Sequence, residues 1–260
     1  TISGILDDGR AASWQAAARD IRAKIRASLW DEARSACFDR DNQGRQLPTL
    51  THNNLRLMYW GALEPDMAAR FVEEHLLNPG EFWTPFPLTS VARNDPLFRS
   101  NKGNDWSGQP QGLTWQRTIT ALENYGYAHL VPVLAEKLFF VLKRDQAFTQ
   151  QFDPDTGEGT GGVMGYGPTM LAFLEYLSRV HGVHLQGEEL WWSAMPGRQT
   201  RYELVWGERR FLLESDGTRA RAFVDGRAAL SFEAGRRLVS DWAGNPVKEI
   251  NLHAGGQIIG

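Results

Sequence analysis

Over much of the first two thirds of the chain, apolar residues recur at steps of three and four, which is the period of an amphipathic helix. In residues 11–30 they are Trp14, Ala18, Ile21, Ile25 and Leu29. The same spacing predicts helices over residues 53–62, 65–77, 112–125, 129–143 and 169–180. Successive helical hairpins of this kind predict an antiparallel α/α array.

The pattern changes after about Glu188. Short β-like runs follow, separated by turn signals such as Asp216-Gly217 and Asp225-Gly226. They cover residues 201–206, 210–214, 220–224, 228–232 and 247–252. We therefore predict two domains, a helical domain over 1–187 and an antiparallel β module over 188–260 that braces it.

The composition of the chain excludes several classes of protein. The chain has 260 residues, of which 42% are hydrophobic, so it can bury a substantial core. A net charge of −3 with mixed signs gives no electrostatic case for nucleic acid or an anionic membrane. No apolar run approaches the roughly 20 residues that span a bilayer, so we expect a soluble protein, in a bacterial cytoplasm or periplasm. The single Cys37 excludes an internal disulfide.

Two long loops, residues 82–110 and 149–168, carry the candidate chemistry. Loops of this length are usually functional. Both combine aromatic, amide and carboxylate side chains, which is what a sugar site needs, because sugars offer apolar ring faces edged by hydroxyls. We predict no metal and no cofactor: Asp39-x-Asp41 lacks the downstream Glu of a calcium loop, and the histidines show no metal-ligand spacing.

The motifs in these loops resemble those of a known family. They read Trp-Thr-Pro-Phe-Pro-Leu-Thr-Ser-Val-Ala from Trp83, Asp-Trp-Ser-Gly from Asp105 and Phe-Asp-Pro-Asp-Thr-Gly-Glu-Gly from Phe152. In this order they resemble the C-terminal half of the (α/α)6-barrel glycosidases, with glycoside hydrolase family 63, the mannosylglycerate hydrolases and the trehalases as the nearest relatives. The resemblance covers residues 15–182. It implies a mainly α toroid, present here as its C-terminal half.

The resemblance also implies a mechanism. Its members invert configuration with two carboxyl groups, which stand about 6.5 to 9.5 Å apart to admit a water. The general acid lies upstream of anything matched here, and the general base falls on Gln150, an amide with no useful proton affinity. Gln150 can mark loss of the base, Glu158 can supply it, or the register can be shifted so that Asp153 or Asp155 lies in the cleft. Asp153 and Asp155 also fit plain turn chemistry.

Substrate-binding residues follow from the same resemblance. Trp106-Ser107-Gly108 falls on the family's Trp-Arg-Gly motif, with Ser107 in place of the Arg. The candidates for lining the cleft are Trp83, Asp105, Trp106, Gly108, Gln109 and Tyr166. For the tryptophans, packing at a helix end is the competing interpretation.

The predicted function is therefore inverting hydrolysis of an α-glucoside or α-mannoside, as part of a longer chain. The alternatives are a catalytically degenerate carbohydrate-binding remnant and a sugar isomerase or epimerase on an α/α barrel. The chain starts at Thr1 rather than Met and supplies about six of the twelve helices such a barrel needs. We therefore expect the missing N-terminal half-barrel, or a second copy of the chain, to cover the apolar side of residues 11–30.

Overall fold

The computed structural model describes residues 2–103, 106, 108–161 and 164–253. The chain forms two compact units. Unit 1 comprises residues 1–125 and 149–163, and unit 2 comprises residues 126–148 and 164–260. The predicted boundary at residues 187/188 stays a prediction.

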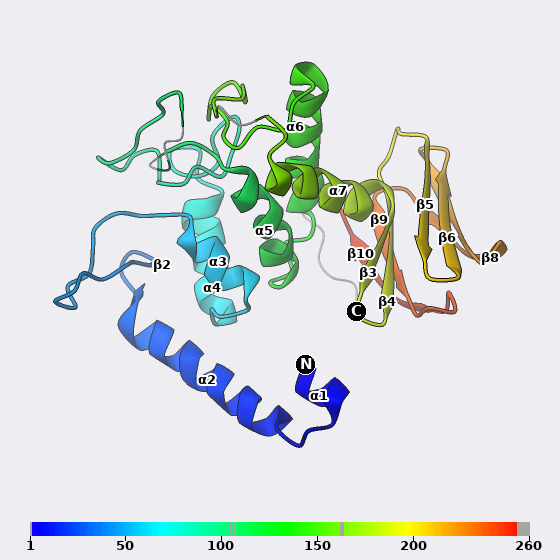
Figure 1. The fold of residues 1–260 in the computed structure, drawn as a ribbon, viewed down its shortest axis with the longest axis horizontal. Coiled ribbons are helices and arrows are strands. Elements are labelled where there is room, and N and C mark those ends of the chain that lie inside the picture. The colour runs from blue at the N-terminus through cyan, green and yellow to red at the C-terminus, as the bar shows by residue number, and fades with distance from the viewer. Residues whose placement is uncertain (1, 104–105, 107, 162–163, 254–260) are drawn as a thin grey trace. The chain divides into compact units, whose positions relative to one another are not determined.

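Unit 1 is built from short helices and long loops (Figure 1). Its elements are α1 (Ile2–Leu6), α2 (Ala11–Ser28), β1 (Trp30–Asp31), β2 (Ala36–Cys37), α3 (Asn53–Tyr59), α4 (Pro65–Phe71), the π-helix η1 (Val72–Leu76) and α5 (Gly112–Glu123). Helices α3 and α5 pack on each other, and the fully buried Met58, Phe71, Trp115 and Ile119 belong to the core of this unit. Pro65 begins α4, where its fixed φ and missing N–H are tolerated.

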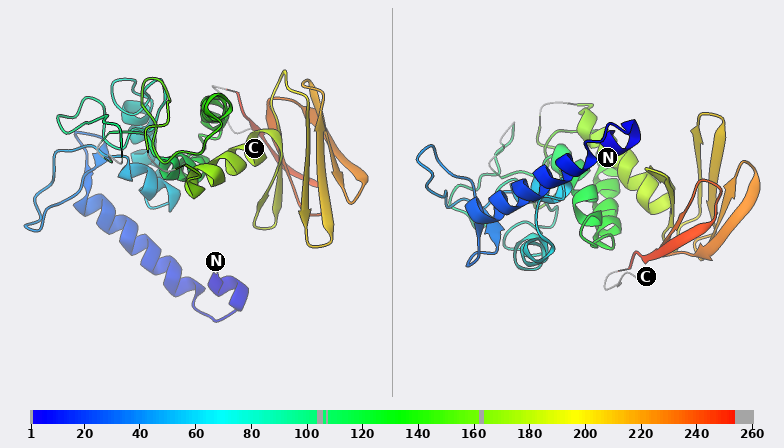
Figure 2. Two further views of the ribbon diagram at one scale, coloured as in Figure 1. Left: turned by 45° about the horizontal axis from the view of Figure 1, so that its top comes forward. Right: turned by 90° about the horizontal axis from the view of Figure 1, so that it is seen from below.

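Helix α2 contributes nothing to the core of unit 1, because none of its residues is buried. Trp14 and Ile21 are 52% and 54% exposed, although they lie on the apolar stripe. Polar contacts hold its C-terminal half: Arg22 Nε donates to the Gly61 carbonyl over 2.8 Å, and Arg26 pairs with Asp66 and Glu32. The rest of α2 extends away from α3 and α4 (Figures 1 and 2).

The described residues of unit 2 form two helices and two four-stranded antiparallel sheets. Its helices are α6 (Leu130–Asp145) and α7 (Gly167–His181). Its strands are β3 (Val183–Gln186), β4 (Glu189–Ala194), β5 (Thr200–Trp206), β6 (Arg209–Ser215), β7 (Arg219–Val224), β8 (Arg227–Glu233), β9 (Arg236–Ser240) and β10 (Pro246–Asn251). One sheet has the order β10-β9-β4-β3 and the other β5-β6-β7-β8. Their shared core includes Trp192, Phe211, Leu213 and Ala222.

The predicted fold class, a mainly α toroid, is wrong. The chain is 34% helical and 24% strand. Its described residues hold seven α-helices, one π-helix and three antiparallel sheets. The individual helices lie close to their predicted positions, but long loops separate them and α2 buries nothing. Strands β3, β4 and β9 were not predicted. Among the described residues, no helix combines the length and the apolar character needed to cross a membrane.

The single cysteine is part of the packing of unit 1. The Asn54 side chain accepts a hydrogen bond from the Cys37 backbone N–H over 2.8 Å and donates one to its carbonyl over 3.0 Å. Burial, together with the nearby Asp39, raises the pKa of the Cys37 thiol to about 12. The thiol is therefore protonated and unreactive in the folded chain.

Candidate functional site

Residues 149–161 form a loop that pairs with the N-terminal end of α5. Gly112 N–H donates to the Gln150 carbonyl over 2.9 Å, and Phe152 N–H donates to the Pro110 carbonyl over 3.0 Å. Within the loop, Phe152 pairs with Gly159 as an isolated bridge. This pairing places the Gln150 segment directly beside the start of α5.

Asp153 caps the turn of this loop. Its Oδ1 accepts hydrogen bonds from the backbone N–H groups of Asp155 and Thr156, each over 2.9 Å, and from the Thr156 hydroxyl over 3.2 Å. Desolvation, the largest single effect, raises the pKa of Asp153, but the hydrogen bonds together outweigh it and lower that pKa. A carboxylate stabilised in its charged form by its own turn is a poor general base.

Asp155 joins the two long loops. Arg93 reaches it with both guanidinium nitrogens, over 2.5 and 3.0 Å. This is the bidentate geometry of a strong ion pair, although both side chains are partly exposed. Phe86 N–H also donates to the Pro154 carbonyl over 2.8 Å. The structure thus brings the predicted loops together, and it uses Asp155 to do so.

Glu158 and Gln150 remain as the candidates at the base position. Glu158 is exposed, and among the described residues its carboxylate makes no ion pair. Gln150 is partly buried, and its amide cannot take a proton from water at neutral pH. The loop therefore offers one uncommitted carboxylate, in a solvent-exposed position.

The predicted aromatic residues lie at the edges of the first loop. Trp83 is partly buried and Trp106 is 39% exposed. The Ser90 hydroxyl donates to the Trp106 carbonyl over 2.5 Å, and Ser90 N–H donates to the Gly108 carbonyl over 3.2 Å. Asp105 lies outside the described residues. Tyr166 belongs to unit 2, where its N–H donates to the Phe148 carbonyl over 2.7 Å just before α7.

Three glutamines under the loops form a buried amide cluster, of which the sequence singled out only Gln109. Gln109, Gln111 and Gln151 are fully buried, and Gln109 Oε1 accepts from the Thr160 hydroxyl over 2.6 Å. Among the described residues, Gln109 Nε2 and Gln111 Oε1 have no hydrogen-bond partner. Unpaired buried polar atoms cost free energy. The Gln-Pro-Gln run before α5 was the signal that could have identified the cluster.

A second hydrogen-bond network, centred on His75, connects the start of the first loop to residues 34 and 75. His75 Nδ1 lies 2.6 Å from Glu81 Oε2, and His75 Nε2 lies 2.6 Å from the Arg34 carbonyl. The Arg34 carbonyl can only accept, so Nε2 carries a proton, and an ionised Glu81 favours a second proton on Nδ1. Burial lowers the pKa of His75, but the bonds to Glu81 and Arg34 outweigh it and raise that pKa. Glu81 in turn accepts from Asn94 over 3.1 Å, inside the loop.

His52 predicts an acid sensitivity of unit 1. Burial, helped by the charges of Arg56 and Arg117, lowers the pKa of His52 to about 4. As pH falls below about 6.5 the unfolded chain takes up a proton that the folded chain refuses, so roughly 3 kcal/mol of stability is lost by pH 4. The contribution of His75 has the opposite sign, since it is present below pH 6.5 and lost as pH rises through its raised pKa.

Urea unfolding of the chain at several pH values measures this loss. We expect His52→Gln to reduce the slope of unfolding free energy between pH 4 and 6.5. An unchanged slope in His52→Gln would contradict the assignment.

Residues 1–167 match the model of one protein family, described as the mannosylglycerate hydrolase MGH1-like glycoside hydrolase domain. The chain belongs to this family. The match confirms the resemblance predicted from the loop motifs, and it covers residues 82–110 and 149–167 of the two long loops. Comparison with the curated proteins found no match.

Solved structures show the same fold in larger proteins. Family 63 mannosylglycerate hydrolase from Thermus thermophilus, solved with glucose, is 23% identical over 61% of this MGH1-like chain, with a TM-score of 0.52. Neutral trehalase Nth1 from Saccharomyces cerevisiae is 17% identical over 64% of the chain, with a TM-score of 0.53. A sialidase is 16% identical over 92%, with a TM-score of 0.68. The chain spans 38%, 30% and 25% of the lengths of these proteins, respectively.

The described residues offer no metal centre. No group of three or more histidine, cysteine, aspartate or glutamate side chains among them is arranged to hold an ion. The two long loops offer hydroxyls, amides, aromatic faces and the Glu158 carboxylate.

Proposed function

We propose that this chain supplies the carbohydrate-binding half of a site for inverting hydrolysis of an α-glucoside or α-mannoside, and that alone it binds the sugar without hydrolysing it. The main support for this proposal is that the two aspartates next to Gln150 in the loop are already bound to other groups of the chain. Asp153 is held by its turn and Asp155 by Arg93. Gln150 itself cannot activate a water.

The comparisons support the sugar class. The similar structures include a mannosylglycerate hydrolase and a neutral trehalase, and the family model carries the same hydrolase in its description. Trp83 and Trp106 provide faces on which a sugar ring can stack, and the loop amides can bind its hydroxyls. An inverting enzyme needs two carboxyl groups about 6.5 to 9.5 Å apart. Since the general acid has no counterpart here, we assign it to a further part of the protein.

One observation favours a second candidate, in which Glu158 is the base and the chain is a competent half of an active hydrolase. The Glu158 carboxylate makes no ion pair among the described residues and is open to solvent. A base of this kind needs only a positioned water and a substrate.

Calorimetry with trehalose and mannosylglycerate, run beside a hydrolysis assay, tests the proposal. We expect binding without turnover, weakened by about 1 to 3 kcal/mol in Trp106→Ala and unchanged in the matched variant Trp206→Ala of unit 2. Hydrolysis that Glu158→Gln abolishes would establish the second candidate. Unchanged affinity with lower thermal stability in Trp106→Ala would show that this side chain only packs. Interconversion of free ketoses would indicate an isomerase.

The exposed stripe of α2 supports a proposal about partners. An apolar helix face that buries nothing marks an interface. We propose that another polypeptide, or a second copy of the chain, covers Trp14 and Ile21. Analytical ultracentrifugation of the chain alone should show association, and Ile21→Asp should abolish it. A stable monomer at all concentrations would contradict the proposal.

A further inference from the structure

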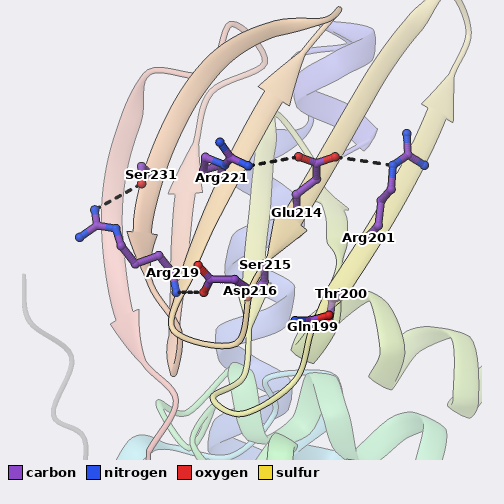
Figure 3. A pocket seen from close by; sticks show the side chains of 9 residues that line it. All are labelled: Gln199, Thr200, Arg201, Glu214, Ser215, Asp216, Arg219, Arg221 and Ser231. Carbon is purple, nitrogen blue, oxygen red and sulfur yellow. Dashed lines mark hydrogen bonds and ion pairs between the residues drawn. The ribbon is translucent and has the colours of Figure 1, made fainter.

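The outer face of the β5-β6-β7-β8 sheet carries a row of three charged residues. Strands β5, β6 and β7 contribute one each. Arg201 on β5 pairs in register with Glu214 on β6, which pairs with Arg221 on β7, which pairs with Ser231 on β8. Successive residues of a strand point to opposite faces. The neighbouring Leu213, Ala220 and Phe232 are buried in the core, so the charged row faces away from it (Figure 3).

The row borders a cavity of about 690 Å³. It is lined by Gln199, Thr200, Arg201, Glu214, Ser215, Asp216, Arg219, Arg221 and Ser231. Seven of these residues lie on the four strands, Asp216 lies in the turn between β6 and β7, and Gln199 directly precedes β5 (Figure 3). They offer charges, hydroxyls and one amide, and no aromatic ring.

The ion pairs between the charged side chains of the cavity are long. Glu214 lies 3.7 Å from Arg201 Nε and 3.7 Å from Arg221 Nη2, beyond hydrogen-bond distance. The Arg201 and Arg221 side chains are 62% and 69% exposed. Arg219 reaches the Ser231 hydroxyl over 3.3 Å and makes no ion pair within the part of the chain that the structure describes. Three guanidinium groups thus retain free donors.

The acidic side chains keep free acceptors. Asp216 Oδ1 accepts the backbone N–H groups of Arg219 and Thr218, over 2.8 and 2.7 Å. These hydrogen bonds lower the pKa of Asp216, so the group is charged at neutral pH. Its Oδ2 has no partner in the described part of the chain. A ligand for the cavity must therefore bring hydroxyl donors to Glu214 and Asp216 as well as an anion to the arginines.

We propose that this cavity binds a uronic acid residue of an oligosaccharide. The carboxylate of the sugar accepts hydrogen bonds from Arg219 and Arg221, which suit planar anions. Its ring hydroxyls donate to Glu214 and Asp216. Sulfate offers acceptors alone and brings no hydroxyl donor to Glu214 or Asp216, whereas a neutral sugar leaves the arginines without an anion. The choice of a saccharide as the ligand rests on the proposed function. The hydrogen-bond donors and acceptors of the cavity are observed independently of it.

Calorimetry of the full chain with tetragalacturonate, neutral galactotetraose and sodium sulfate tests the proposal. We expect tetragalacturonate alone to bind, with affinity reduced about tenfold or more in Arg219→Gln and in Arg221→Gln. Arg210→Gln is the matched control, because Arg210 pairs with Glu203 over 3.2 Å outside the cavity. Its affinity should stay within about twofold of the unmodified chain. Circular dichroism of each variant should show that the sheet is retained.

Each other outcome would overturn the proposal. Equal binding of galactotetraose would show that the arginines do not select the ligand, and equal binding of sulfate would show an anion site only. An Arg210→Gln effect as large as that of Arg221→Gln would show a general charge effect. No binding of tetragalacturonate at about 10 mM would exclude the site. Because Trp106→Ala changes only unit 1, failure here is distinguishable from failure of the proposed function.

Discussion

Gly108→Ala is expected to destabilise unit 1 by roughly 1 to 3 kcal/mol or more, and to weaken sugar binding at the same time. A Cβ on Gly108 would lie 1.5 Å from the Arg99 carbonyl oxygen and 2.5 Å from its carbon. Both are backbone atoms, so no side-chain rotation can relieve the contact. The loop segments at Arg99 and Gly108 would have to separate, which would strain the bond from Ser90 N–H to the Gly108 carbonyl. Trp106, held by the same Ser90, would move with them.

Denaturant unfolding and calorimetry with a sugar ligand measure the two effects in one variant. Gly167→Ala is the matched control, because a Cβ there meets nothing within 4 Å and Gly167 begins helix α7. We expect it to be neutral or to stabilise by about 0.5 kcal/mol. If Gly108→Ala were as stable as Gly167→Ala, the close approach of the loop segments would not exist in solution.

Trp192→Ala is expected to cost roughly 3 to 5 kcal/mol of the unfolding free energy of unit 2, the range for removing a large buried aromatic side chain. Trp192 is fully buried between the two sheets. Its Nε1 donates to the Ser240 hydroxyl over 2.9 Å, and its ring meets Phe211 edge-on at 6.2 Å between centroids. The change therefore removes packing and leaves a buried hydroxyl without its donor.

Thermal and urea unfolding followed by near-ultraviolet circular dichroism should detect the loss. Trp206→Ala provides the control, because Trp206 is 58% exposed at the end of β5 and should change stability by less than about 0.5 kcal/mol. Similar losses in both variants would mean that Trp192 does not anchor the core of the two sheets.

Local periodicity identified most helices and the strands whose polarity alternates. The predicted run 201–206 became β5 (Thr200–Trp206), and 210–214 lies inside β6 (Arg209–Ser215). Strand β9 was missed because its Arg-Arg start suggests an exposed segment, although Arg237 is fully buried. Its guanidinium donates to the Ser193 hydroxyl over 3.1 Å and to the Arg179 carbonyl over 3.1 Å. Such partners are distant in sequence, so no local pattern announces them.

In the candidate site, too, local features could be predicted from the sequence, and contacts between distant residues could not. The turn role of Asp153 was foreseeable, because Asp155 follows it by two residues and Gly157 by four, and an aspartate in such a segment caps its own turn. The pairing of Arg93 with Asp155 joins residues 62 positions apart, and the buried amides depend on contacts between two loops. Periodicity could not test the predicted toroid. The spacing of apolar residues shows which face of each helix is apolar, but not which element packs against that face.

The buried thiol gives this chain a reporter of local opening that needs no engineering. Cys37 is the only cysteine, and its thiol reacts only as the thiolate. With its pKa raised to about 12, the folded state contributes almost nothing to alkylation near neutral pH. Labelling therefore counts excursions in which the β1-β2 pair separates from Asn54. Mass spectrometry of the alkylated chain over time would give the free energy of that excursion, and comparing it with global unfolding would show whether this corner of unit 1 frays on its own.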